Sequence, residues 1–293
     1  MNKFGDYAKG VIQMTTSSLM FSIMATLVVY ARHIDFFTTA LYRFLVGVFV
    51  LGTLALFRRI KLDYNNSKVL FLRGFLGGIS VVLFYLAIIK LGIAKGTVIS
   101  FTYPVFATTG GLIFLKERVR PLVWVFMISA LVGVTLLTYE GESNMLRLDL
   151  WTLLAFAGAV IGGQALVCVK RLTRTDSSYS IYMSQCLMGF WLVVIPANLI
   201  PTKVGMWGII ILLAIGLSAI LAQLLMNWGF GKLSIPTGSL LGLVTPVCNV
   251  FIGIFLFGEI LGPFELLGVC LVLASCVAIV WGDRAKAKAA PRS

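Results

Sequence analysis

Residues 100–121 read SFTYPVFATTGGLIFLKERVRP, and residues 242–263 read GLVTPVCNVFIGIFLFGEILGP. Several residues recur between the two stretches at a constant shift of 142 positions, and the correspondence extends to their N-terminal sides. The matched pairs are Lys90 and Lys232, Gly96 and Gly238, Pro104 and Pro246, Val105 and Val247, Glu117 and Glu259, and Pro121 and Pro263. Duplicated apolar units interrupted by proline are typical of secondary transporters, which arrange two gates around one central site. The repeat therefore indicates transport.

The composition of the whole chain is that of a membrane protein. Hydrophobic residues make up 59% of its 293 residues, charged residues make up 12%, and the mean hydropathy is +1.00. A water-soluble chain needs more polar residues to cover its surface. A membrane β-barrel would need alternating segments of about ten residues, whereas these apolar runs are continuous, so the predicted fold class is an all-α polytopic membrane protein. Ten spans are predicted near residues 9–31, 36–57, 67–90, 93–115, 121–139, 150–169, 179–199, 204–228, 233–257 and 262–282.

Basic residues are distributed unevenly between the predicted loops. If the N-terminus is cytoplasmic, 18 of the 24 Lys and Arg residues lie on the inside, Arg73 among them. Five lie outside, and Arg43 alone lies within a span. The positive-inside rule then predicts that both termini are cytoplasmic, in a multi-pass protein of the inner or plasma membrane. The formal net charge of +13 follows from this topology and gives no support to nucleic-acid binding.

Each copy of the repeat contains five predicted spans. Because five is an odd number, the second copy enters the membrane from the opposite side, which predicts two inverted repeats related by a pseudo-two-fold axis in the membrane plane. We expect the first repeat at residues 1–140, the second at residues 150–282, and a cytoplasmic tail at residues 283–293. The first apolar run has no small-residue cleavage site after a short core, so it is expected to be a retained helix.

The histidine and the cysteines of the sequence do not indicate a metal site, a disulfide or a cofactor. His33 is the single histidine and is expected to be a solvated loop residue, because it has no carboxylate cluster near it. The five cysteines fall inside predicted spans without CxxC spacing, so neither a disulfide nor a zinc site is expected. They are Cys168, Cys186, Cys248, Cys270 and Cys276.

The two quoted stretches resemble the EamA-type members of the drug/metabolite transporter superfamily. The most specific feature is a proline in the fourth and ninth spans that is followed thirteen residues later by a glutamate, and the motifs ALYRF at 40–44 and LRGFLGG at 72–78 also fit. The resemblance implies ten helices in two inverted five-helix repeats, a substrate cavity between the repeats, and alternating access. It leaves the substrate open, since related members handle amino acids, nucleotide-like metabolites, vitamins and drugs.

Pro104 and Pro246 lie near the middle of the fourth and ninth spans. Each proline removes a backbone N–H and frees the carbonyl four residues earlier, that of Ser100 or Gly242, so the helix can bend there. We interpret this pair, with Gly96 and Gly238, as gate or hinge positions; the alternative is a static kink with glycines that serve only close helix packing.

Arg43 is predicted within a span, where a cation costs several kcal/mol unless it faces water, a partner or a substrate. Its guanidinium fork suits a substrate carboxylate or phosphate. The alternative is an arginine bonded to helix-end carbonyls. Its repeat mate is Gln185, so the predicted site is asymmetric in charge.

Other polar or aromatic residues lie at a depth that suits a substrate cavity. Amides provide hydrogen bonds and rings provide stacking for an amphiphilic organic molecule, although interhelical hydrogen bonding explains each of them equally well. Tyr85 and Asn227 are repeat mates. The predicted substrate-binding residues, besides Arg43 and Gln185, are Tyr42, Tyr85, Tyr103, Gln164, Tyr182, Gln223, Asn227 and Trp228.

Glu117 and Glu259 are the acids that invite a proton-coupled mechanism. Both lie at predicted helix ends, where capping of the next helix or pairing with a neighbour is the favoured role. The first span contains Thr15, Thr16 and Ser17 but lacks the membrane-embedded glutamate of small multidrug exporters in the same superfamily. No GxxxxGK[ST] phosphate loop is present. Exchange or facilitated diffusion is therefore expected, and ATP-driven pumping is not.

The sequence thus predicts a transporter, not an enzyme, that moves a small polar or zwitterionic organic metabolite, amino-acid-like or nucleoside-like, by alternating access. Its expected partners are this substrate and the lipid bilayer, and its expected state is a monomer or a weak dimer. The alternatives are an amphiphile or lipid flippase and a drug exporter of the same fold. A membrane-embedded lipid enzyme is disfavoured because it would need a nucleophile–base pair or clustered acids and histidines.

Overall fold

The structure is a computed structural model of the 293-residue chain. It describes residues 3–31, 33–91, 93–137, 149–199, 202, 204–257 and 262–289, and every regular element among them is a helix. The twelve helices are α1 Lys3–Tyr30, α2 Phe36–Leu56, α3 Ser67–Leu91, α4 Ile93–Ser100, α5 Tyr103–Phe114, α6 Pro121–Leu137, α7 Leu150–Leu172, α8 Ser178–Leu199, α9 Met206–Lys232, α10 Ile235–Gly242, α11 Val244–Phe257 and α12 Pro263–Ala289.

These helices make ten membrane segments. Eight are long and apolar enough to cross a bilayer by themselves, with α10 and α11 counted together as residues 235–256. Two shorter apolar segments, Val98–Phe114 and Pro121–Leu136, supply the fourth and fifth spans of the first half. Large apolar side chains such as Phe49, Phe255 and Trp281 are exposed on the outside of the bundle, where lipid would cover them. The predicted all-α polytopic fold class is confirmed.

The two halves keep the 142-residue register of the sequence repeat. Helix α4 begins at Ile93 and α10 at Ile235, while α6 begins at Pro121 and α12 at Pro263. Proline suits the first turn of α6 and α12, because the missing N–H has no intrahelical partner there.

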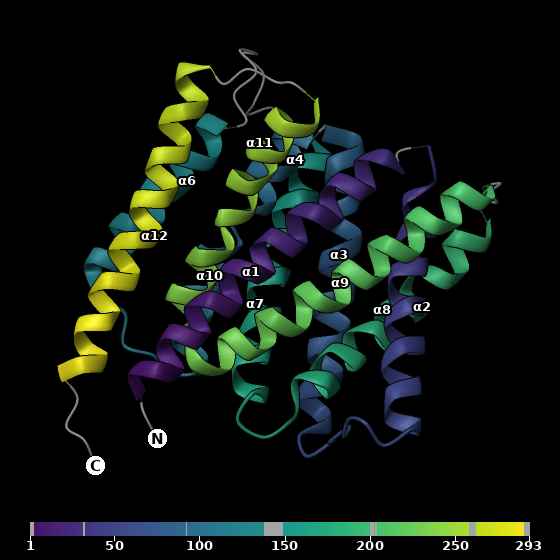
Figure 1. Ribbon diagram of the computed structural model, residues 1–293, viewed down its shortest axis with the longest axis horizontal. Helices are drawn as coiled ribbons and strands as arrows, with labels where there is room; N and C mark the ends of the chain where they lie inside the picture. Colours follow the sequence, from purple (N-terminus) through teal and green to yellow (C-terminus); the bar gives the residue numbers. More distant parts are fainter. Residues whose placement is uncertain are drawn as a thin grey trace.

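The halves are interleaved and do not form separate bodies. Helix α1 packs along α9 and α3 packs along α7, and these two pairs are repeat mates. Helices α6 and α12 pair with each other at one edge of the bundle, and α2 pairs with α8 (Figure 1). Each helix of one repeat therefore buries its face against the other repeat, and the two inverted five-helix repeats share one core.

The fourth and ninth spans are both broken near their prolines. Helix α4 ends at Ser100 and α5 starts at Tyr103, so Pro104 lies in the first turn of α5. Helix α10 ends at Gly242 and α11 starts at Val244, two residues before Pro246. The predicted bends are thus interruptions, and each proline belongs to the half-helix that follows.

Backbone carbonyls at the ninth-span break find donors on three other helices. The carbonyl of Ser239 accepts from the Tyr103 hydroxyl at 3.2 Å, that of Leu241 from Ser18 Oγ at 3.1 Å, and that of Leu240 from Cys276 Sγ at 3.4 Å. The sequence had pointed to the Gly242 carbonyl, but these side chains reach carbonyls one to three residues earlier, in the last turn of α10. The backbone N–H of Leu243 also bonds to the carbonyls of Leu240 and Leu241.

Candidate functional site

Polar side chains gather where α2, α3 and α8 meet. On α2 the face that meets α8 carries Ala40, Arg43, Phe44 and Gly47 at helical spacing. On α8 the facing residues are their repeat mates, Tyr182, Gln185, Cys186 and Gly189. The pseudo-two-fold axis therefore passes between these two helices. We call Arg43, Arg73, Tyr85, Tyr182, Gln185 and Cys186 the central cluster; all six are buried.

Glycines allow the helices around the central cluster to approach closely. A Cβ at Gly189 would overlap the ring of Phe44, and a Cβ at Gly47 would overlap Cys186 Sγ. These two contacts are repeat mates of each other. A Cβ at Gly77 would overlap the guanidinium of Arg73, so this glycine gives the arginine its space.

Arg43 lies inside α2 with 3% of its surface exposed. Its Nη1 donates to the hydroxyl of Tyr85 at 3.3 Å, and its guanidinium lies 6.0 Å from the ring centroid of Phe44. The bonded partner is thus a neutral side chain on α3. The alternative of an arginine held by helix-end carbonyls is not what these contacts show.

Arg73 corrects a prediction made from the sequence. It was counted among the cytoplasmic basic residues because it lies near the start of the third span, but it is 2% exposed. Its Nη2 donates to Gln185 Oε1 at 2.9 Å, and Gln185 Nε2 in turn donates to the carbonyl of Gly77 at 3.2 Å. Arg43 is therefore not the only cation inside the bundle, and the mate of Arg43 on α8 is the acceptor of a second arginine.

Among the described residues, no acid balances the charge of the central cluster. The two arginines lie near enough for their charges to interact, and no described carboxylate is bonded to either of them. Arg43 Nε and Arg73 Nε are buried without a hydrogen-bond partner in the described part of the chain. An unpaired buried donor costs about 1–3 kcal/mol, and an acceptor that entered the cluster would remove that cost.

Several predicted binding residues lie elsewhere and hold helices together. Tyr103 bonds α10 as described above, and Gln164 Nε2 donates to the carbonyl of Phe106 at 3.0 Å between α7 and α5. Tyr42 packs against the apolar cluster formed by α1 and α9. For Tyr103 and Gln164, interhelical bonding is the role that the contacts support.

The remaining predicted residues lie on α9. Asn227 is buried, and its Nδ2 donates to the carbonyl of Ser178 at 3.2 Å. Trp228 stacks edge to face with Tyr179 at 5.9 Å. Gln223 is buried, with its amide nitrogen 3.9 Å from Met226 Sδ. These three residues are not bonded to the central cluster.

Both predicted gate glycines are buried. A Cβ at Gly238 would crowd the ring of Phe230, so this glycine lets α10 approach the end of α9. Its mate Gly96 lies in α4.

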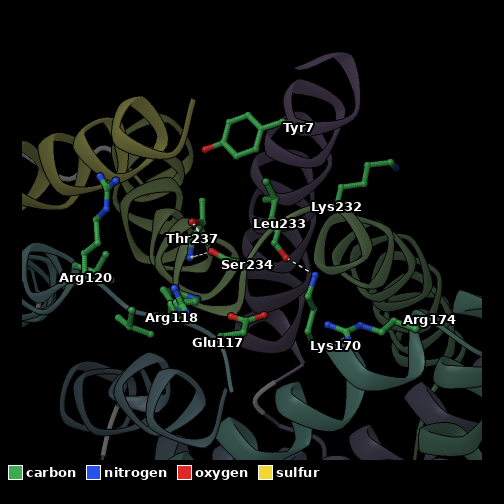
Figure 2. A pocket seen from close by; sticks show the side chains of 13 residues that line it. Tyr7, Glu117, Arg118, Arg120, Lys170, Arg174, Lys232, Leu233, Ser234 and Thr237 are labelled. Carbon is green, nitrogen blue, oxygen red and sulfur yellow. Dashed lines mark hydrogen bonds between the residues drawn. The ribbon is translucent and has the colours of Figure 1, made fainter. Parts of the chain in front are cut away.

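A second feature is a cavity of about 450 Å³ at the end of the bundle where both termini lie (Figures 1 and 2). It is bordered by the link from α5 to α6 and by the corner between α9 and α10. Its polar lining comes from Tyr7, Glu117, Arg118, Arg120, Lys170, Arg174, Lys232, Ser234 and Thr237.

Two charged residues of this cavity fasten the α9–α10 corner. Lys170 Nζ donates to the carbonyls of Phe230 at 2.8 Å and Leu233 at 2.7 Å, so it caps the end of α9. Glu117 Oε2 accepts from the backbone N–H of Ile235 at 3.0 Å, so it caps the start of α10. Glu117 was expected to cap the next helix or to pair with a neighbour, and it caps a helix of the other repeat. Its mate Glu259 lies outside the described residues.

Ten membrane helices in two inverted repeats around a buried polar cluster define a multi-pass membrane transporter. The EamA-like transporter family matches this chain twice, over residues 8–139 and 149–281, and the chain belongs to that family.

Named relatives cover most of the chain. The pseudopaline exporter CntI of Pseudomonas aeruginosa is 24% identical over 92% of this chain and 95% of its own. The uncharacterized transporter YwfM of Bacillus subtilis is 31% identical over 67% of this chain and 68% of the YwfM chain. The riboflavin transporter of Vibrio cholerae is 25% identical over 76% of this chain and 75% of the riboflavin transporter. One crystal structure shares the fold with a TM-score of 0.78 at 17% identity, over 94% of this chain and 98% of that chain.

Proposed function

We propose that this transporter moves a small polar or zwitterionic organic metabolite whose carboxylate or phosphate is held by Arg43 and Arg73. The observation that carries the proposal is the pair of buried arginines, each with an unpartnered Nε and neither bonded to an acid in the described structure. A guanidinium stays charged at any physiological pH, and its fork accommodates two oxygens of one anionic group. A bound anion would supply the missing acceptors and offset the repulsion between the two cations.

The rest of the central cluster supports an organic substrate. Tyr85 and Tyr182 present phenol groups, and both are buried beside Arg43. Phenols provide both ring contact and a hydrogen bond to an amphiphilic molecule. The names of the pseudopaline exporter and the riboflavin transporter place organic small molecules among the substrates of related chains.

We propose that the substrate crosses by alternating access, with the interrupted fourth and ninth spans as hinges. The half-helix α5 contacts α10, so the two interrupted spans meet directly, and Tyr103 joins them by one hydrogen bond. A hinge that pivots at residues 101–102 or 243 needs few hydrogen bonds to change, because the backbone ladder is already interrupted there.

We propose that transport proceeds by exchange or facilitated diffusion and is not driven by a proton gradient. In the described part of the chain, Asp176 is the one buried acid, and its Oδ1 accepts from the backbone N–H of Asn65 at 2.8 Å in a loop between spans. A proton-coupled exchanger needs a carboxylate that the substrate and the proton reach in turn. Asp176 does not meet that need.

The test is counterflow into proteoliposomes of the purified protein, screened with labelled amino acids and nucleotide-like metabolites with and without a pH gradient. For a substrate that the protein accepts, we expect Arg43→Gln to raise the half-saturation constant about tenfold or more. An analogue in which an amide replaces the carboxylate should be transported equally by the wild type and by Arg43→Gln. Arg43→Lys keeps the positive charge but lacks the guanidinium fork, so its half-saturation constant should lie between those of the wild type and Arg43→Gln.

Arg171→Gln is the matched control, because Arg171 is an exposed arginine of α7 outside the central cluster. Unchanged affinity for an anionic substrate in Arg43→Gln would overturn the proposed anchor. Transport that collapses whenever the pH gradient is removed would overturn the proposed coupling, and transfer of a lipid probe in place of metabolites would favour the flippase alternative.

A further inference from the structure

The cavity at the α9–α10 corner carries a strong positive charge. Five basic side chains line it and one acid accompanies them, which gives a formal charge of +4. These side chains come from the α5–α6 link, from the end of α7 and from the end of α9, so three segments far apart in the sequence converge on one space. The basic residues are Arg118, Arg120, Lys170, Arg174 and Lys232.

The two lysines are already used by the fold. Lys170 caps α9, as described above, and Lys232 Nζ donates to Gln13 Oε1 at 2.7 Å on α1. Figure 2 shows Lys232 directed away from the middle of the cavity. The lysines therefore leave the recognition of any ligand to the arginines.

Arg118 and Arg174 line the cavity from opposite sides of Glu117. Figure 2 shows the Arg118 guanidinium beside Glu117 and below Ser234, while Arg174 points toward Lys170 from the opposite side. Both are exposed, and neither is hydrogen-bonded to another described residue. The nearby carboxylate of Glu117 is bonded to the Ile235 amide. Arg120 stands farther away, toward α12.

We propose that this cavity is a second binding site, which takes a phosphate-bearing anion between Arg118 and Arg174. A volume of about 450 Å³ admits a phosphate group with a small organic part. Guanidinium forks on two sides match the oxygens of a phosphate, and Lys170 and Lys232 add charge around it. The same chemistry belongs to a soluble phosphate and to the headgroup of an anionic lipid.

The site acts on the corner that it borders. Arg118 follows Glu117 directly in the sequence, and Arg174 lies four residues after Lys170, in the turn that follows α7. An anion that draws these arginines together holds Glu117 and Lys170 at α10 and α9. A ligand that binds this arrangement more tightly than an opened one stabilises it. The site is separate from the central cluster, so its failure would leave the proposed transport function untouched.

The experiment compares two double variants in nanodiscs. Arg118→Gln with Arg174→Gln removes both proposed ligands, and Arg59→Gln with Arg171→Gln removes two exposed arginines that do not line the cavity. Thermal unfolding midpoints are followed by tryptophan fluorescence. One arm titrates inorganic phosphate into phosphatidylcholine nanodiscs at constant ionic strength, and the other replaces part of the lipid by phosphatidylglycerol without phosphate.

We expect the wild type and the control variant to be stabilised in at least one arm, and the Arg118/Arg174 variant to lose that response, with phosphate binding weakened about tenfold. Stabilisation by inorganic phosphate identifies a soluble anion, and stabilisation by phosphatidylglycerol alone identifies a lipid headgroup. Equal responses of the two double variants, or no response of the wild type in either arm, would overturn the proposal. A variant with Arg118→Lys and Arg174→Lys keeps both positive charges but lacks the guanidinium forks. It should fold and retain part of the response, which separates loss of charge from a folding defect.

Discussion

Arg73 is the residue whose position depends most on its neighbours. A buried arginine needs acceptors, and Gln185 Oε1 supplies one at 2.9 Å while Gly77 leaves space for the guanidinium. Gln185 is itself held by its bond to the Gly77 carbonyl. A neutral amide thus holds a full charge inside the bundle, and no described acid forms an ion pair with it.

Replacement of Gln185 by leucine should destabilise the protein more than the loss of one ordinary hydrogen bond. The substitution leaves Arg73 buried without its acceptor, so we expect the free energy of unfolding to fall by about 1.5–3 kcal/mol. The measurement is unfolding in mixed micelles by titration with sodium dodecyl sulfate, followed by tryptophan fluorescence.

The control for this substitution is Gln223→Leu. Gln223 is equally buried, but its amide nitrogen faces Met226 Sδ at 3.9 Å, a weak contact. Its loss should cost less than about 1 kcal/mol. Similar losses in both variants would show that Arg73 does not depend on Gln185.

The sequence located Arg43 but missed Arg73, and the reason is physical. Counting charges near span ends assigns a basic residue to the water side from the position of its Cα alone. The charged group of a long side chain, however, lies several ångströms from that Cα and can be in a different environment. The motif LRGFLGG held a usable signal. Gly77 leaves space for the Arg73 guanidinium, while Gly74 and Gly78 let α3 approach α8 closely, and such a small-residue face beside a cation favours burial against another helix.

At the scale of elements, the contact between α2 and α8 rests on reciprocal pairs of small and large residues. Phe44 lies on Gly189, and its mate Cys186 lies on Gly47. Both pairs lie next to the arginine-bearing turn, so the spacing of these helices also sets the dimensions of the central cluster.

Gly189→Ala should therefore destabilise the protein by about 1–3 kcal/mol, because the added methyl group overlaps the ring of Phe44. Combination with Phe44→Leu should restore part of this loss in the same detergent titration.

Gly52→Ala is the matched control on α2, since the nearest atom to its Cβ is Met183 Cε at 3.9 Å. It should be neutral or stabilising by up to about 1 kcal/mol, because alanine is the better helix former. A loss in Gly52→Ala as large as that in Gly189→Ala would contradict the steric explanation.

Helix interruptions were predictable because proline acts locally, while the bonding around them was not. Pro104 and Pro246 marked both breaks to within a few residues. The donors to the last turn of α10 come from Ser18, Tyr103 and Cys276, which lie on three different helices. Only the assembled bundle brings these partners together. For the same reason, the depth of Tyr103 and Gln164 predicted a substrate site but could not predict their bonds to the backbone carbonyls of Ser239 and Phe106.

At the scale of the whole molecule, the number of spans and the repeat register followed from the sequence. Apolar run lengths and the 142-residue shift depend on composition and order alone, and the helix starts at Ile93, Ile235, Pro121 and Pro263 keep that shift. The interleaving of the halves depends on side-chain packing, so it appears only in the structure. The repeat boundaries near residues 140 and 150 remain our proposal, because residues 138–148 lie outside the described part of the chain.

Both termini lie at one end of the bundle, and the positive-inside rule predicts that this end is cytoplasmic (Figure 1). Green fluorescent protein fused after residue 293 should therefore fluoresce in whole bacterial cells, because it folds in the cytoplasm. Alkaline phosphatase fused at the same place should be inactive, because its disulfides form only in the periplasm. The opposite pair of results would reverse the topology and place the basic cavity outside.

The two-fold relation between positions 43 and 185 also limits how such a chain can be built. If two identical five-helix polypeptides paired across this axis, both would carry arginine at this position, and two like charges would lie on facing helices. A single polypeptide that contains both halves can carry arginine on one side and glutamine on the other. The joining of two half-length genes therefore permits a charge pattern that no homodimer of half-length chains can possess.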